Sequence, residues 1–97
     1  MRDYVFVEDV AGAITKSIVH SGGSRVFNIG CGEGTTVLNI VELIGRRLEC
    51  LHRTTGPQDV PVSILDCSRA LAELRWSPRV SLVEGLSRTI AWHRAGI

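Results

Sequence analysis

The chain has neither a concentrated charge nor a paired-cysteine spacing. Its 97 residues carry a formal charge of +1, from 11 basic and 10 acidic side chains spread along the sequence. Nucleic-acid binders and membrane-surface binders concentrate their cations, so neither partner class is expected. The three cysteines are odd in number and show no C-x-x-C spacing, which excludes a disulfide framework and a zinc site of that kind.

Targeting and membrane-spanning features are also missing. The first four residues contain no apolar signal region, and no apolar run approaches the roughly 20 residues needed to cross a bilayer. We therefore expect reduced thiols, a cytoplasmic location and no membrane partner. The histidines, His20, His52 and His93, are far apart along the chain, so no metal site and no nucleophile–base pair is indicated.

The hydrophobic pattern that is present predicts an α/β unit with about three short strands and four helices. Strands are expected over residues 4–7, 26–29 and 60–65. Helices are expected after residues 8–9, after residues 35–36, around residues 70–74, and from residue 81 onward. A chain of this size fits one domain and buries only about two-thirds of its unfolded surface, so self-association through uncovered apolar faces is expected.

Residues that favour helix starts precede each predicted helix. In chain order these candidates are Glu8 or Asp9, Thr35 or Thr36, Asp66 or Ser68, and the capping box of Ser81 with Glu84. The second helix is the most regular, since its apolar positions 37, 40, 41, 44 and 48 have the spacing of one helix face. Trp76 and Trp92 are expected to anchor the core.

A glycine-rich turn, residues 30–34, follows the second predicted strand and precedes a helix. Such a turn can direct backbone N–H groups at a phosphate. The dinucleotide fingerprint G-x-G-x-x-G would, however, require glycine where Thr35 stands. The stretch also resembles the first motif of the S-adenosylmethionine-dependent methyltransferases, except that Asn28 replaces their acid. The favoured interpretation is that the glycines permit a tight connection.

Four separated stretches form one pattern in one order. They are R-D-Y-x-x-V-x-D-V at residues 2–10, N-I-G followed by Gly-x-Gly and two threonines at 28–36, D-V with L-D and W-x-P between 59 and 78, and S-L-x-E-G-L with Thr and Trp between 81 and 92. This pattern resembles the C-terminal third of the extended short-chain dehydrogenase/reductase family, which includes UDP-glucose 4-epimerase and the sugar-nucleotide dehydratases. In such enzymes a Rossmann domain holds NAD, a Tyr-x-x-x-Lys pair reacts, and a smaller domain grips the nucleotide sugar.

The chain lacks the catalytic elements that the resemblance implies for the complete enzymes. Tyr4 is the only tyrosine, Glu8 stands four positions after it, and Lys16 is the only lysine. Residues 1–97 are therefore expected to form a single C-terminal substrate-binding unit without the N-terminal dinucleotide-binding part. We expect no catalytic residue and no bound cofactor in this chain, with NAD implied for the parent enzyme.

The resemblance implies three substrate-side residues. Arg2 matches the arginine of R-D-Y, which would pair with the pyrophosphate of a nucleotide sugar, a solvated arginine being the alternative. Asp59 matches the acid of the family's R-x-G-D loop, and Ser63 lies where some members carry an aromatic residue near the nucleotide. The loop's arginine is replaced by Gly56, and Arg53 is near enough to substitute for it.

Three functions of different classes remain open from the sequence. The first is a nucleotide-sugar-binding segment of an epimerase or dehydratase that is not catalytic alone. The second is a self-associating interaction module, and the third is a methyltransferase-like fragment that binds S-adenosylmethionine. The pattern does not identify the base or the sugar of the nucleotide sugar. It also does not distinguish epimerisation from dehydration as the reaction of the parent enzyme.

Overall fold

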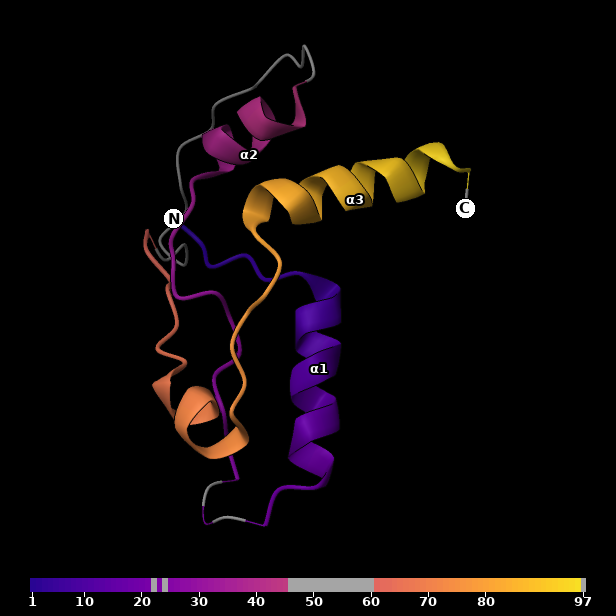
Figure 1. Cartoon of the computed structure of the whole chain (residues 1–97). Helices are drawn as coiled ribbons and strands as arrows, with labels where there is room; N and C mark the ends of the chain where they lie inside the picture. Colours follow the sequence, from indigo (N-terminus) through magenta and orange to yellow (C-terminus); the bar gives the residue numbers. More distant parts are fainter. Residues whose placement is uncertain (22, 24, 46–60, 97) are drawn as a thin grey trace.

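Four helical segments make up the regular structure of the computed structural model, which describes residues 1–21, 23, 25–45 and 61–96. They are α1 (Val7–Ile18), α2 (Val37–Ile44), the π-helical segment η1 (Ala70–Leu74) and α3 (Leu82–Arg94). Helix α1 packs against η1, and α2 packs against α3, so the chain forms two helix pairs joined by extended segments (Figure 1). The four helices predicted from the sequence are confirmed in the same order.

The predicted strands are not confirmed. Within the described part of the chain no segment forms a strand of successive paired residues, and only two isolated bridges occur, both at Arg2. The first expected strand ends where α1 begins, at Val7. The second contains Val26, whose side chain is 73% exposed. β-Branched residues favour a strand only where a neighbouring strand accepts and donates backbone hydrogen bonds, and the described residues provide no such strand for these segments.

The core lies between α1 and η1. Its buried members are Ala13, Ala70, Leu74 and Trp76, with half-buried Val5, Phe27, Ile29 and Cys67 packed around them. Trp76 is thus the core anchor expected from the sequence. The same prediction for Trp92 is wrong, because it is 52% exposed on α3 and contacts the neighbouring ring of His93 edge-on.

Capping side chains start α2 and α3 as predicted. In each case a side-chain oxygen accepts a hydrogen bond from the backbone N–H group three residues further on, Thr36 from Asn39 (3.1 Å) and Ser81 from Glu84 (3.2 Å). The cap position of η1 is Arg69, which makes no side-chain cap bond, and the Asp66 carboxylate accepts from the Ser68 N–H group (2.9 Å) ahead of that segment.

Helix α1 begins without a capping side chain. Phe6 occupies the cap position and makes no side-chain cap bond, so the prediction that Glu8 or Asp9 caps this helix is wrong. Both carboxylates contact other segments instead. Oε1 of Glu8 lies 2.7 Å from Nη2 of Arg88 on α3, and the Arg88 guanidinium stands 4.7 Å from the centre of the Phe6 ring. These contacts join the start of α1 to α3.

Asp9 connects α1 to the segment that precedes α3. Its side chain is buried, and Oδ2 accepts hydrogen bonds from the backbone N–H groups of Arg79 (3.2 Å) and Val80 (3.0 Å). The indole N–H of Trp76 donates to the Asp9 carbonyl oxygen at 2.8 Å. A buried carboxylate requires such partners to offset its lost hydration, which explains why Asp9 serves a tertiary contact.

No helix among the described residues is long and apolar enough to cross a membrane.

Candidate functional site

Backbone pairing brings Arg2 between two segments that are distant in sequence. The N–H group of Arg2 donates to the Thr35 carbonyl at 3.0 Å, and the Thr35 N–H group donates to the Arg2 carbonyl at 2.9 Å. On the other side, the Ser63 N–H group donates to the Met1 carbonyl at 3.0 Å, and Arg2 and Ser63 form a parallel bridge. Two of the three predicted site residues are therefore neighbours.

The Arg2 segment also lies beside the start of α2. Thr35 pairs with Arg2 and immediately precedes Thr36, the cap of α2. The first turn of α2 contains no acidic residue, so the partial positive charge of the helix N-terminus is not offset there. The guanidinium of Arg2 donates to the Met1 carbonyl through Nη1 at 3.0 Å and carries a permanent charge. This combination suits an anionic group.

The third predicted residue, Asp59, lies outside the described residues, as do Gly56 and Arg53. The role expected for Asp59 stays a prediction.

A carboxylate of the chain itself fills the glycine-rich turn. Oδ1 of Asp3 accepts a hydrogen bond from the Cys31 N–H group at 2.6 Å. Oδ2 accepts from Gly32 at 3.0 Å and from Leu65 at 3.1 Å. A Cβ atom at Gly30 would stand 2.6 Å from Asp3 Oδ2, so glycine is required for the carboxylate to approach. The Cys31 and Gly32 N–H groups of the turn are therefore occupied by a carboxylate of the chain.

The charge state of this cluster follows from the same contacts. Burial acts to raise the pKa of Asp3, but hydrogen bonds from Cys31 and the other N–H donors outweigh it and hold the pKa below its ordinary value. Burial raises the pKa of the Cys31 and Cys67 thiols, and the nearby Asp3 charge adds to this effect. Thiols with a raised pKa stay protonated near neutrality and are poor nucleophiles.

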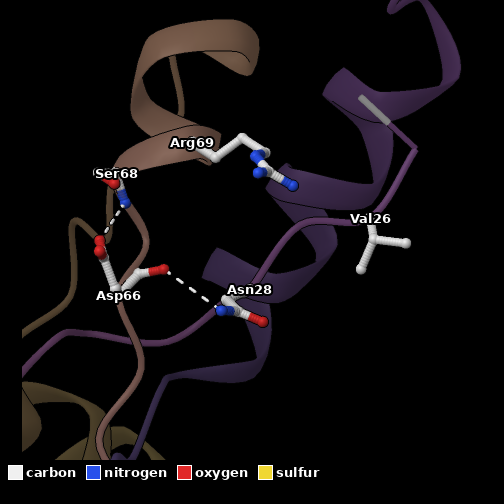
Figure 2. A pocket seen from close by; sticks show the side chains of 5 residues that line it. All are labelled: Val26, Asn28, Asp66, Ser68 and Arg69. Carbon is white, nitrogen blue, oxygen red and sulfur yellow. Dashed lines mark hydrogen bonds between the residues drawn. The ribbon is translucent and has the colours of Figure 1, made fainter. Parts of the chain in front are cut away.

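A polar hollow of about 360 Å³ lies away from this site, lined by Val26, Asn28, Asp66, Ser68 and Arg69 (Figure 2). Figure 2 shows the Asn28 amide directed at the chain near Asp66, whose carbonyl it contacts at 3.5 Å. The asparagine at the position of the methyltransferase acid thus holds two segments of the chain together. Neither Arg2 nor Ser63 lines this hollow.

The described residues contain no group of three or more His, Cys, Asp or Glu side chains that could bind a metal ion. His20 packs edge-on to the Phe27 ring, with 5.4 Å between ring centres, and its Nε2 lies 3.6 Å from Glu73 Oε1.

The sequence and the structure of this chain are similar to those of known enzymes. No protein-family model matches it. The crystal structure of UDP-glucose 4-epimerase from Thermotoga maritima with UDP-glucose matches 97% of this chain with a TM-score of 0.87 and 41% sequence identity. The chain belongs to the extended short-chain dehydrogenase/reductase family. The resemblance of the four dispersed stretches to this family is thereby confirmed.

Two further members of the family match nearly the whole chain. The dTDP-4-dehydro-6-deoxyglucose reductase of Escherichia coli is 37% identical over 92% of this chain. UDP-glucose 4-epimerase from Stenotrophomonas maltophila, solved with NAD and formylated UDP-arabinopyranose, is 32% identical over 97% of this chain, with a TM-score of 0.85. The chain spans only about three-tenths of the length of these relatives, 29% of the reductase and 30% of this epimerase.

Sequence reasoning missed the most connected acid of this region. Asp3 belongs to the R-D-Y stretch, but the sequence pattern alone predicts no functional role for it. A usable signal existed in the glycine turn, because three glycines at 30, 32 and 34 can accommodate a group that approaches the backbone closely. The sequence left open whether that group came from a ligand or from the chain.

Proposed function

We propose that this chain is the nucleotide-sugar-binding, C-terminal part of an NAD-dependent epimerase or a related sugar-nucleotide enzyme, and that Arg2 binds the pyrophosphate. The observation that carries the proposal is the pairing of Arg2 with Thr35 and Ser63 beside the start of α2. The Thermotoga maritima epimerase, which is similar over nearly the whole chain, was solved with UDP-glucose.

The electrostatics of this region support a dianionic ligand group. A planar guanidinium can donate two parallel hydrogen bonds to phosphate oxygens. Val37, in the first turn of α2, is 64% exposed, so the positive end of the helix is open to a ligand. The carboxylate of Asp3, adjacent to Arg2 in sequence, is directed at three backbone N–H groups, which limits its repulsion of an incoming phosphate.

The chain is proposed to bind without catalysing. The family's reactive pair is missing, since Tyr4 has Glu8 four positions later, and Asp3 occupies N–H groups of the glycine turn. NAD would be held by another part of the parent enzyme, as the Stenotrophomonas maltophila epimerase was solved with NAD. Asp59 and Ser63 are proposed to contact the nucleotide sugar beside Arg2.

Equilibrium binding of UDP-glucose to the chain and two arginine variants tests this function. Arg2→Ala removes the proposed phosphate ligand and should weaken binding by about tenfold or more, the usual effect of losing a charged hydrogen bond. Arg94→Ala, at the distant end of α3, is the matched control and should bind as the parent chain does. Equal affinities for the Arg2→Ala and Arg94→Ala variants would contradict the assignment of Arg2.

An exposed apolar stripe favours the second candidate function, association with another protein surface. The stripe consists of Val7, Ile14 and Ile18 on one face of α1, and these side chains are 58% to 77% exposed. The opposite face of α1 carries Asp9 and Ala13 and is buried. A contiguous apolar surface on a chain with so small a core indicates a surface that another chain or segment covers.

The methyltransferase-like function is disfavoured by the filled turn. S-adenosylmethionine added to the chain should leave the backbone amide resonances of residues 30–36 unchanged, since Asp3 occupies the Cys31 and Gly32 N–H groups. Shifts confined to those residues would restore that alternative.

A further inference from the structure

One carboxylate ties the N-terminal segment to both of the segments that flank it. Asp3 accepts three backbone hydrogen bonds, two from the glycine turn at Cys31 and Gly32 and one from Leu65. Asp3 directly follows Arg2, whose backbone pairs with Thr35, and Leu65 lies two residues after Ser63. The contacts of Asp3 at Gly32 and Leu65 thus lie within three residues of the backbone pairings of Arg2 with Thr35 and Ser63.

The pairing around Arg2 is too short to hold its position alone. It consists of two isolated bridges and not of continuous strands, and single bridges offer few hydrogen bonds against thermal opening. The three bonds of Asp3 are charge-assisted and therefore stronger than those of the neutral bridges. Without them, the two flanking segments would be attached to the N-terminal segment by the bridge bonds at Arg2, Thr35 and Ser63 and by the bond from the Met1 ammonium to the Pro61 carbonyl.

We propose that Asp3 is the positioning residue of the nucleotide-sugar site: it fixes the segments of Thr35 and Ser63 on either side of Arg2 and, by filling the glycine turn, occupies N–H groups that would otherwise compete with Arg2 for the phosphate. This inference rests on the proposed function for its ligand. Its structural part, the clamping of the two segments by the carboxylate, stands independently of any ligand.

The chemistry requires a carboxylate and not merely a polar side chain of the same shape. Three N–H groups converge on both oxygens of Asp3, Cys31 on Oδ1 and the pair of Gly32 and Leu65 on Oδ2. An asparagine offers one oxygen and one NH₂ group, so at least one N–H donor would face another donor. The isosteric change is therefore expected to break the clamp without changing its volume.

Two variants disrupt the clamp by different routes, and each has a matched control. Asp3→Asn removes the charge, whereas Asp66→Asn makes the same change at an exposed carboxylate that caps only Ser68. Gly30→Ala keeps Asp3 but would place a Cβ atom 2.6 Å from its Oδ2, whereas Gly23→Ala adds a Cβ atom with no neighbour within 4 Å. Circular dichroism verifies that all four variants retain their helices.

UDP-glucose affinity and the amide spectrum are measured for all of them. Asp3→Asn and Gly30→Ala should bind UDP-glucose about tenfold more weakly, the loss typical of a charged hydrogen-bond network, while both controls bind as the parent chain does. Before ligand is added, the amide resonances of Arg2, Thr35 and Ser63 should move in the two clamp variants and not in the controls. A purely structural carboxylate would lower thermal stability without changing affinity below the unfolding transition.

Inorganic phosphate provides an independent readout of the filled turn. In an Asp3→Ala variant, phosphate should shift the amide resonances of Cys31 and Gly32 saturably, because the vacated N–H groups form an anion-binding concavity. In the parent chain it should not shift them.

The outcomes separate this inference from the proposed function. If the parent chain binds UDP-glucose and the Asp3→Asn variant binds it equally, the positioning role is refuted and the function stands. If the parent chain fails to bind, the function fails, while moved resonances at Thr35 and Ser63 in Asp3→Asn still support the clamp. Unmoved resonances there, or phosphate shifts at Cys31 in the parent chain, would overturn it.

Discussion

Single acidic side chains connect segments of this molecule that its short elements do not connect. Asp3 joins the N-terminal segment to the glycine turn and to Leu65, and Asp9 joins α1 to the segment before α3. In both cases the partners are backbone N–H groups that would otherwise lack an acceptor. The contacts of these two side chains therefore help to determine how the helices and the candidate site are placed.

Asp9→Ala should lower the free energy of unfolding by about 2 kcal/mol, because it removes the acceptor of the part-buried N–H groups of Arg79 and Val80. Urea denaturation followed by circular dichroism measures this change. Glu8→Ala removes a partly exposed ion pair to Arg88 and should cost less than about 1 kcal/mol. Equal costs for the two variants would contradict the account of Asp9.

Acid should destabilise the chain through Asp3 and Asp66. Hydrogen bonds hold the pKa of both carboxyl groups below the ordinary value in the folded state. As pH falls, the unfolded chain therefore binds more protons than the folded chain. Their stabilising contribution is complete above the unfolded pKa of about 3.9 and is lost as pH falls through the lower folded value. An Asp3→Asn, Asp66→Asn double variant should show a flatter dependence of stability on pH below about 4. An unchanged slope would show that neither carboxylate gains its hydrogen bonds on folding.

At the scale of elements, the helices predicted from local signals are confirmed, whereas the predicted strands are not. Thr36 and Ser81 cap their helices through contacts within three residues, so their effect can be predicted from the sequence. A strand depends on a partner elsewhere, and the segment containing Val26 finds none in the described part of the chain. The acids at the start of α1 failed as caps for the same reason, because distant partners at Val80 and Arg88 compete for them.

The candidate site could be predicted only in part. The R-D-Y pattern identified Arg2, and pairing with Ser63 places those two residues together. The contacts of Asp3 could not be predicted, because they require knowing that Leu65 and the glycine turn meet at one point. No periodicity in the sequence encodes that meeting.

Thr36→Ala should destabilise α2 by about 1 kcal/mol, the usual cost of losing an N-cap. No residue of α2 is buried, so the loss should appear as local opening and not as global unfolding. Amide hydrogen exchange should accelerate within α2 while α1 is unaffected. Thr15→Ala, which removes a hydroxyl from the middle of α1, is the control and should leave exchange in α2 unchanged.

At the scale of the whole molecule, the core is too small for the apolar surface that surrounds it. Among the described residues four buried hydrophobic side chains form the core, whereas α1 alone exposes Val7, Ile14 and Ile18 along one face. The relatives are about three times as long as this chain, as the 31% coverage of the Thermotoga maritima epimerase shows. Both facts are consistent with a segment that functions against another surface.

The apolar stripe of α1 should cause self-association of the isolated chain. Sedimentation at high concentration should give a mass above that of the monomer, and Ile18→Lys should restore the monomer by placing a charge in the stripe. Val83→Lys, at an exposed position on α3, is the control and should not affect association. A clean monomer for the unaltered chain would contradict self-association.

The most direct test of the nucleotide-sugar site is a titration of the isotope-labelled chain with UDP-glucose, followed through its backbone amide resonances. Saturable shifts at Arg2, Thr35, Val37 and Ser63, absent in Arg2→Ala, are the expected result, because these residues meet where Arg2 pairs with its neighbours. No shift at these four residues with millimolar UDP-glucose would contradict the proposed function.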